Sequence, residues 1–473
     1  MKNIEVFGPG DFEPERHFYP RVLNAQIHPL VRHFFQLGPE RIAERYAHLH
    51  PGTDRSAITK LIRSPTKNFR WGGADLFLTT DNTGSRQVVV IETNSCPSGQ
   101  KSMPLLDDAD ELGSYRQLIE RAFLPHLPKR ARGSLCVLFD KNEMEASGYA
   151  ASIAEITGED VLLVPAFANE AVHHRVEEGQ LIVRHEGKDV LIRGAIRYVT
   201  QHPWTRLPPI TRTFILNPVI VCLAGGRNKA VAAKAYDLFN ADMSEQGLHI
   251  RTPETFWDVG LDEIPMWVAR MGNVAVVKNP YSNAGQGVYT ITNATELKLF
   301  MEMDHRYDRF IVQALIGNRA WTSRTARGER LYHVGTIPNK RMQIFVSDLR
   351  FMVGSGPEGF FPVGMYARRA RSPLLSELPA GESSWNMLGT NLSVRSPKGE
   401  WSTETGRLLL FDNRDFNKLG IGVDDLIEAF IQTVMSVTAI DRMTQRLTTQ
   451  KGVFRRKFFR QLNPDAALAA EIL

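Results

Sequence analysis

The sequence predicts a mixed α/β fold, in which a small parallel sheet accompanies antiparallel β-rich blocks. Three observations favour this fold class. Residues 134–165 alternate strand, helix and strand, the pattern of a parallel β-α-β unit. Two β-rich runs within 74–94 flank a turn that contains Asp81 and Gly84, which indicates an antiparallel hairpin. Further β-rich runs extend from 273 to 370 with one helical segment among them.

The remaining elements follow from apolar spacing. The periodicity of apolar residues predicts helices within 20–63, at 229–239, at 294–302 and at 424–445. We expect the chain to divide into four segments: a helical segment with the hairpin at 1–130, a small parallel domain at 131–226, a segment with a Gly-containing loop at 227–320, and a β-rich remainder with the final helix at 321–473.

Composition narrows the class of protein. The chain has 473 residues, 43% hydrophobic and 23% charged, which is ordinary for a globular protein. No apolar run reaches the ~18 residues of a membrane helix, and the N-terminus lacks the apolar core of a signal peptide. We therefore expect a cytoplasmic protein without a membrane partner. The net charge of +5 is mostly dispersed, and no nucleic-acid recognition motif is present. The sequence is compatible with a homodimer.

A glycine-containing loop between two strands is a candidate phosphate site. The strand "AVVK" ends in Lys278, and a loop that includes Ser282, Gly285, Gln286 and Gly287 precedes the next strand. Glycine permits close approach of backbone N–H groups to phosphates, and a lysine adds positive charge. The alternative interpretation is an ordinary hairpin with an exposed lysine.

Two further features favour the phosphate interpretation. Lys229 begins a predicted helix after a Gly-Gly pair, and helix N-termini attract phosphates. The strand "RFIVQALIG" follows the loop, and its end offers backbone groups to an adenine edge at Gln313, Ala314 and Leu315.

This order of motifs resembles the ATP-grasp superfamily of carboxylate ligases. In that family a metal-binding Glu-x-Asn phrase usually comes late in the chain, whereas "IETNSCPSG" precedes the glycine loop here. The order is therefore rotated, and it is similar to that of circularly permuted relatives such as glutathionylspermidine synthetase. The resemblance implies an ATP-grasp fold in permuted order, with a pre-ATP-grasp-like domain at 131–226 and a nucleotide-binding subdomain at 227–320.

The resemblance also implies a magnesium site at Asp75, Glu92 and Asn94. Residues i and i+2 of a strand point to one side, so Glu92 and Asn94 share a face, and the hairpin brings Asp75 alongside them. Oxygen ligands together with nucleotide phosphates suit Mg2+. By resemblance these residues hold two Mg2+ ions on ATP. The alternative is that Glu92 and Asn94 cap the strand end.

The residues after Glu-x-Asn are candidates for the substrate pocket. Cys96 is either a nucleophile or a wall of the pocket, and we favour the wall because no sequence phrase identifies a histidine partner. By resemblance, Ser98, Gly99 and Gln100 contact substrate or a developing oxyanion. Cys136 and Cys222 lie within apolar runs and are expected in the core.

Arginines supply positive charge to oxyanions in this chemistry. Arg350 in "SDLRFMV" resembles the family's Asp-x-Arg phrase, and Arg368 with Arg369 resembles a later phosphate- or carboxylate-facing arginine. Arg70 is a looser match. Asn391 resembles the asparagine of an Asn-Leu-Ser phrase. An acid that binds ribose usually follows the adenine hinge, but "GNRAWTSRT" contains none.

The predicted function is an ATP- and Mg2+-dependent ligase that joins a carboxylate to an amine through an acyl phosphate. The substrates would be small molecules, with amino acids and peptides as candidates. A small-molecule kinase on the same fold is the alternative. A basic nucleic-acid-binding module is a third hypothesis, and it predicts salt-sensitive binding that survives loss of Asp75 and Glu92.

Overall fold

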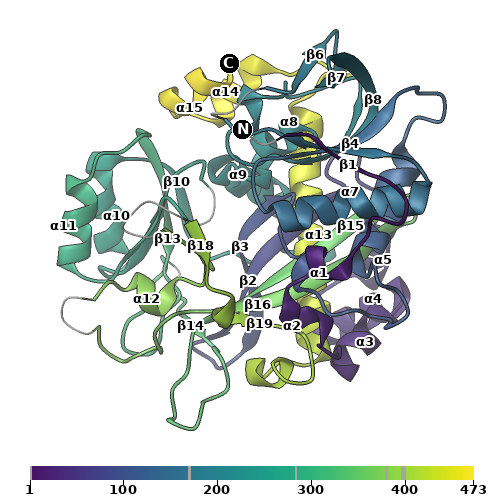
Figure 1. Ribbon diagram of the computed structural model, residues 1–473. Coiled ribbons are helices and arrows are strands. Elements are labelled where there is room, and N and C mark those ends of the chain that lie inside the picture. Colours follow the sequence, from purple (N-terminus) through teal and green to yellow (C-terminus); the bar gives the residue numbers. More distant parts are fainter. Residues whose placement is uncertain (1–2, 169–171, 283–284, 327, 379–381, 396–400) are drawn as a thin grey trace.

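The computed structural model describes residues 3–168, 172–282, 285–326, 328–378, 382–395 and 401–473. Their strands form three larger sheets of seven, six and four strands and one two-stranded hairpin. Figure 1 shows the four-stranded sheet set apart from the other two, with the six-stranded sheet in the middle of the molecule. The predicted mixed α/β fold class is confirmed.

The seven-stranded sheet contains the predicted parallel unit. Its order is β1-β5-β4-β8-β7-β6, with β9 beside β8. Strands β4, β5, β8 and β9 run parallel, and helix α7 (Glu143–Thr157) links β4 to β5. The bounds are β1 Glu5–Phe7, β4 Ser134–Phe139, β5 Val161–Pro165, β6 His174–Glu177, β7 Gln180–His185, β8 Lys188–Tyr198 and β9 Phe214–Leu216.

One strand of this sheet comes from outside the segment predicted for it. β1 pairs antiparallel with β5, so the first strand of the chain completes a sheet otherwise built from 134–216. A three-residue strand has too little periodicity to be recognised in the sequence.

The six-stranded sheet is antiparallel and joins distant parts of the chain. The predicted hairpin is β2 and β3, and β2 also pairs with β15, which pairs with β16. Helix α13 (Val423–Arg446) packs across β2, β3 and β15. The bounds are β2 Trp71–Asp81, β3 Arg86–Ser95, β14 Leu331–His333, β15 Ser347–Gly356, β16 Gly359–Arg369 and β19 Leu408–Leu409.

Short helices from the N-terminal part of the chain extend this core. The predicted helical stretch 20–63 forms four helices, and α3, α4 and α5 contact α13. Their apolar faces bury Phe34, Ile42 and Ile58 in the same hydrophobic cluster as α13. The bounds are α1 Pro14–His17, α2 Pro20–Leu23, α3 Pro29–Phe35, α4 Pro39–Leu49 and α5 Arg55–Arg63.

The four-stranded sheet has the order β10-β13-β11-β12 and is antiparallel. Helices α10 (Ile264–Arg270) and α11 (Ala294–Glu302) cover one face and bury Val268 and Phe300 against it. Polar side chains of β11 and β13 are therefore left for the opposite face. The bounds are β10 Thr255–Gly260, β11 Ala275–Lys278, β12 Val288–Ile291 and β13 Arg309–Ala314.

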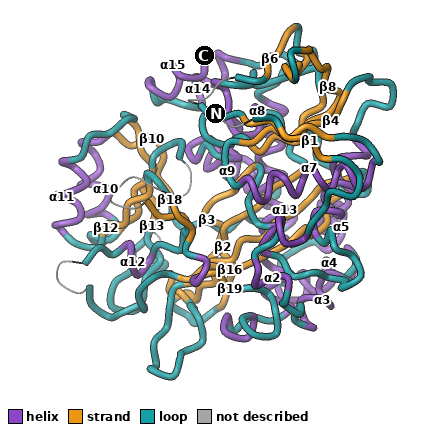
Figure 2. Tube along the Cα trace, viewed as in Figure 1, coloured by secondary structure: helices purple, strands orange, loops and turns teal. Residues whose placement is uncertain are grey.

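The end of the chain ties the four-stranded sheet to the rest of the molecule. Asp465 accepts the backbone N–H groups of Asp308 and Arg309 at 2.8 and 2.9 Å, just before and at the start of β13. Figure 2 shows the short C-terminal helices beside the seven-stranded sheet. No helix in the described ranges has both the length and the apolar character to cross a bilayer. The remaining elements include α6 Ser114–Leu118, α8 Val219–Val221, α9 Lys229–Asp242, α12 Trp385–Leu388, β17 Ser393–Arg395, β18 Trp401–Thr403, α14 Arg456–Leu462 and α15 Ala466–Ile472.

Candidate active site between the sheets

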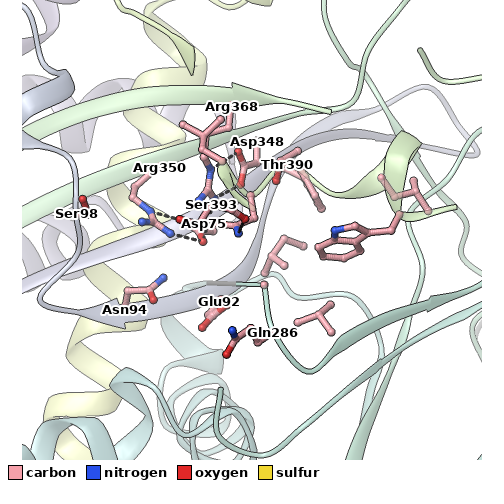
Figure 3. Close-up of a pocket in the computed structure, with 18 of the residues that line it drawn as sticks. Asp75, Glu92, Asn94, Ser98, Gln286, Asp348, Arg350, Arg368, Thr390 and Ser393 are labelled. Atoms are coloured by element: carbon pink, nitrogen blue, oxygen red, sulfur yellow. Dashed lines mark hydrogen bonds and ion pairs between the residues drawn. The ribbon is translucent and has the colours of Figure 1, made fainter. Parts of the chain in front are cut away.

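A cavity of about 530 Å3 lies where the three sheets face one another. The six-stranded sheet contributes Asp75, Glu92 and Arg350, and the four-stranded sheet contributes Lys278. Loops that follow β4 and β8 of the seven-stranded sheet line another end of the cavity. A second cavity of about 320 Å3 shares Glu92 and Lys278 with the first. The cavity therefore collects residues from all three sheets, and Figure 3 shows part of its lining.

A row of polar side chains crosses three strands of the six-stranded sheet. Asp75 on β2 lies opposite Glu92 on β3 and opposite Arg350 on β15. Asn94, two residues after Glu92, lies opposite Gly73. All four side chains line the cavity, and Figure 3 shows Asp75, Glu92 and Asn94 near one another. The hairpin thus places the three predicted metal ligands together, as alternation along a strand requires.

Asp75 is held by two arginines. Arg350 donates through Nε and Nη2 to the two carboxylate oxygens at 2.6 and 2.7 Å. Arg368 lies 3.1 Å from the same carboxylate and also pairs with Asp348. Burial alone would raise the pKa of Asp75, but the two guanidinium groups outweigh it and hold that pKa well below its usual range. Asp75 is therefore ionised at neutral pH.

Two lysines bracket Glu92 from the other side. Lys229, at the first turn of α9, lies 3.4 Å from the carboxylate of Glu92 and donates to Ser282 Oγ at 2.9 Å. Lys278 donates to Gln313 Oε1 at 2.7 Å. Burial lowers the pKa of Lys278 to about 8, and Glu92 partly opposes that shift. Lys278 lines both cavities, whereas Lys229 lines only the second. Both lysines therefore lie near the boundary between the two cavities.

The donor set fits Mg2+. Two carboxylates and an amide offer oxygen ligands, which hard divalent cations prefer, and nucleotide phosphates or waters would complete the shell. The side-chain nitrogen of Asn94 is buried and has no hydrogen-bond partner among the described residues, so it can donate to a bound group, whereas a metal would use the amide oxygen. In the described part of the chain, no three His, Cys, Asp or Glu residues cluster as a metal site by themselves.

The glycine loop borders the same cavity. Gly285 and Gln286 line it, and both Gly285 and Gly287 have positive φ angles, of 74° and 64°. An added Cβ at Gly287 would come within 2.4 Å of Asn279, so a side chain would also clash there. Residues 283–284 of the predicted loop lie outside the described residues. Asn391 lines the cavity and lies next to Gly285.

The residues of the predicted adenine hinge border the cavity, but two of their backbone N–H groups are occupied. Gln313, Ala314 and Leu315 line the cavity. The N–H group of Leu315 donates to Ser323 Oγ, and that of Ala314 donates to the carbonyl oxygen of Glu254, both at 2.8 Å. Contact with a base at these two residues would therefore not use their N–H groups.

Three predicted residues lie elsewhere. Arg70 is not among the residues that line the cavity, and its guanidinium group lies 5.9 Å from the ring of Phe214. Arg369 alternates away from Arg368 and lies over Phe345. Cys96 is fully buried in a hydrophobic cluster, and burial raises the pKa of its thiol. Cys96 is therefore neither a wall of the cavity nor an activated nucleophile, because a thiolate needs a lowered pKa.

The turn after β3 is positioned by a residue that the sequence did not single out. Glu145 on α7 accepts hydrogen bonds from Ser98 Oγ at 2.6 Å and from the backbone N–H groups of Gly99 and Gln100 at 2.7 and 3.0 Å. Ser98 lines the cavity, whereas Gly99 and Gln100 do not. Their role is to shape the turn, because their N–H groups are used by Glu145.

Further charged residues of the cavity also escaped prediction. Lys101, Asp140, Lys141, Arg227 and Asp348 line it. One sequence signal would have found two of them, because Asp140 and Lys141 directly follow the parallel strand β4, and ligands bind at the carboxyl ends of parallel strands. Arg227 and Lys101 carry no comparable signal.

Comparisons with known proteins give similarity at the level of structure alone. No protein-family model and no curated protein sequence matches the chain. A RimK domain ATP-grasp protein from Sphaerobacter thermophilus aligns at 15% identity and a TM-score of 0.30, over 52% of this chain and 92% of its own. A glutathione synthetase-like effector from Globodera pallida aligns at 11% identity and a TM-score of 0.37, over 74% and 85%.

A D-alanyl-alanine synthetase A from Vibrio cholerae aligns at 10% identity and a TM-score of 0.29, over 55% of this chain and 94% of its own. One of these three proteins is described as ATP-grasp, the superfamily that the motifs of this chain resemble. Because these TM-scores lie below 0.5, the function proposed next rests on this chain's own residues. The circular permutation stays a prediction.

Proposed function

We propose that this protein is an ATP- and Mg2+-dependent ligase that activates a carboxylate as an acyl phosphate and joins it to an amine. One observation carries the proposal. Glu92, Asp75 and Arg350 form a row on the six-stranded sheet, and Lys229 and Lys278 lie near this row, where the two cavities meet. Carboxylates for a divalent cation, lysines for phosphates and an arginine for a developing oxyanion are the groups that phosphoryl transfer to a carboxylate requires.

The residues divide the work as follows. Lys229, Lys278 and the backbone at Gly285–Gly287 bind the phosphates of ATP. Asp75, Glu92 and Asn94 would hold Mg2+, which neutralises phosphate charge when bound. Arg350 uses Nε and Nη2 on Asp75, which leaves its Nη1 group for the acyl phosphate.

The reaction has two steps. A carboxylate oxygen of the substrate attacks the γ-phosphorus, and the bond to ADP breaks. The amine then attacks the acyl carbon, phosphate leaves with the oxygen that linked it, and the amine loses a proton. The chain contributes mainly charge and position to both steps.

The test is a screen for ADP release with pairs of carboxylic acids and amines, beginning with amino acids. Release that requires both partners supports ligation. A stable phosphorylated product formed without an amine would favour the kinase alternative instead.

Glu92→Gln is the decisive variant for the metal assignment. We expect turnover to fall at least about 100-fold, because the substitution removes the negative charge of a proposed Mg2+ ligand at the site of phosphoryl transfer. Glu302→Gln is the matched control, since Glu302 is exposed on α11. An unchanged rate in Glu92→Gln would refute the assignment.

A further inference from the structure

Loops of the seven-stranded sheet form one end of the cavity. β4 continues through α7 to β5 on one side, whereas β8 is followed by β9 on the other. The chain leaves these neighbouring parallel strands in opposite directions, and open parallel sheets bind ligands at such a position. Lys141 and Asn142 after β4, and Gln201 after β8, line the cavity here.

Cationic side chains gather at this end. Lys101 and Arg227 line the cavity together with Lys141. Arg227 donates to the carbonyl oxygen of Ser95 at 3.2 Å, which fixes its guanidinium group beside the strand that carries Glu92. Asn142 donates to Ser98 Oγ at 3.1 Å, so the loop after β4 and the turn after β3 are in direct contact. All three cations therefore line the same cavity, and the charge of Arg227 acts on Lys141.

The nearby carboxylates, Asp140 and Glu145, also have other partners, although Oδ1 of Asp140 has no hydrogen-bond partner among the described residues. Asp140 accepts the backbone N–H groups of Thr200 and Gln201 at 2.9 and 2.8 Å, and its carboxylate lies 3.3 Å from Arg206. Glu145 accepts the donors of the turn after β3, and Lys101 lies 3.9 Å from it.

Lys141 has no carboxylate within 4.0 Å of its ammonium group in the part of the chain that the structure describes. The ammonium group lies 5.4 Å from the ring centre of Tyr198. Burial, together with the charges of Arg227 and Arg350, lowers the pKa of Lys141 to about 7, although Asp140 and Glu145 raise it. Like charges held together in a partly desolvated site are stabilised by a bound anion.

We propose that the end of the cavity at Lys101, Lys141 and Arg227 binds a carboxylate of a substrate, distinct from the carboxylate that is activated beside Arg350. This inference rests on the ligase function proposed above and adds a substrate class to it. At least one of the two substrates carries a free carboxylate that takes no part in the reaction. The ammonium and guanidinium groups supply the charge for this carboxylate.

A substrate comparison tests the proposal. Each acid–amine pair that releases ADP is assayed again with its unreacted carboxylate replaced by a carboxamide. We expect kcat/KM to fall about 10- to 100-fold, the usual loss when a charge-assisted hydrogen bond is removed. Active pairs that have no second carboxylate, or that tolerate the carboxamide equally, would overturn the proposal.

Lys141→Gln should reduce this discrimination. We expect the ratio of kcat/KM between the acid and its carboxamide to move toward one, because the variant removes the charge that separates them. Lys60→Gln, on the exposed face of α5, is the matched control and should keep the wild-type ratio. A wild-type ratio in Lys141→Gln would contradict a role for this ammonium group, and a folding defect alone would not change the ratio.

A labelling experiment separates failure of this inference from failure of the ligase proposal. Acetic anhydride labels unprotonated amines, and at pH 7 about half of Lys141 is unprotonated if its pKa is about 7. Citrate should slow acetylation of Lys141 relative to sodium chloride of equal ionic strength, as read by peptide mass spectrometry. Protection without any ADP release would refute the ligase alone. Equal labelling in citrate and chloride would refute the anion site alone.

Discussion

Asp75 and Glu145 are both buried carboxylates near the cavity, but their partners differ. Asp75 is 8% exposed, lines the cavity and is held by the guanidinium groups of Arg350 and Arg368. Glu145 is 0% exposed, lies behind the wall and is held mainly by hydroxyl and backbone N–H groups. The first carboxylate has charged side chains as partners, whereas the second is held mainly by uncharged groups, three from the turn after β3 and two tyrosine hydroxyls.

This difference indicates two kinds of task. A carboxylate paired with arginine side chains can exchange them for a cation or a substrate, because those side chains also face the cavity. A carboxylate that accepts backbone N–H groups fixes the path of the chain, and removing its charge disturbs the fold. We therefore expect Asp75 to act in the reaction and Glu145 to position the turn that carries Ser98 and Lys101.

The largest effect is expected for Asp75→Asn. Turnover should fall at least about 100-fold, because the site loses a charge that is needed for the cation and for the alignment of Arg350. The loss should persist at temperatures where circular dichroism shows a folded variant. Asp108→Asn, at an exposed position, is the control. Full activity of Asp75→Asn would contradict the claim that Asp75 acts in the reaction while Glu145 only positions a turn.

Glu145→Gln should act on stability first. The amide nitrogen cannot accept the hydroxyl or N–H donors that now meet a carboxylate oxygen, so at least one buried donor loses its partner, at a cost of about 1–3 kcal/mol. We expect a lower melting temperature, and a loss of turnover that shrinks as the assay is cooled. A variant with wild-type melting but no activity would place Glu145 in the chemistry instead.

The pH dependence of kcat/KM tests Lys141, on which both Arg350, a partner of Asp75, and Glu145 act electrostatically. The charged groups that act on it are Arg227, Arg350, Asp140 and Glu145. Because its pKa is lowered to about 7, the ammonium form is present below pH 7 and is lost above it. We expect kcat/KM for a carboxylate-bearing substrate to fall as pH rises through 7, by up to about tenfold per unit.

The control for this profile is Lys141→Arg, whose guanidinium group stays charged across the range. The fall near pH 7 should be absent from the variant. A fall of the same size in both proteins would assign the titration to another group.

The smallest effect on activity is expected for Cys96→Ala. Cys96 directly follows β3 and is buried. Its side chain lies in a hydrophobic cluster and does not line the cavity. We expect turnover to change by less than about twofold and stability to fall by about 1 kcal/mol, as for a small buried truncation. Loss of turnover by orders of magnitude in a folded variant would restore the nucleophile hypothesis.

Much of the fold follows from local patterns. The hairpin of β2 and β3, the β4-α7-β5 unit and the long helix α13 are read from alternation and helical periodicity. The same alternation placed Glu92 and Asn94 on one face, because side-chain direction in a strand depends only on parity. Strand β1 escaped because three residues carry no periodic signal.

The rest of the site depends on tertiary contacts. Whether an arginine reaches the cavity depends on which strand lies beside it, so Arg350 and Arg368 were found by resemblance while Arg70 proved to lie against Phe214. Glu145 looked like an ordinary helical residue, because the sequence does not show that it accepts hydrogen bonds from a turn about 45 residues earlier in the chain. Cys96 drew attention by its chemistry, yet burial decides its reactivity.

The most direct test follows one oxygen atom. A substrate carboxylate enriched in 18O is incubated with ATP, Mg2+ and the amine, and the released phosphate is analysed by mass spectrometry. An acyl phosphate transfers one carboxylate oxygen to the phosphate, so each phosphate released in the first turnover should carry one 18O. Phosphate without 18O, formed while the amide accumulates, would contradict the proposed activation of the carboxylate between Arg350 and the lysines.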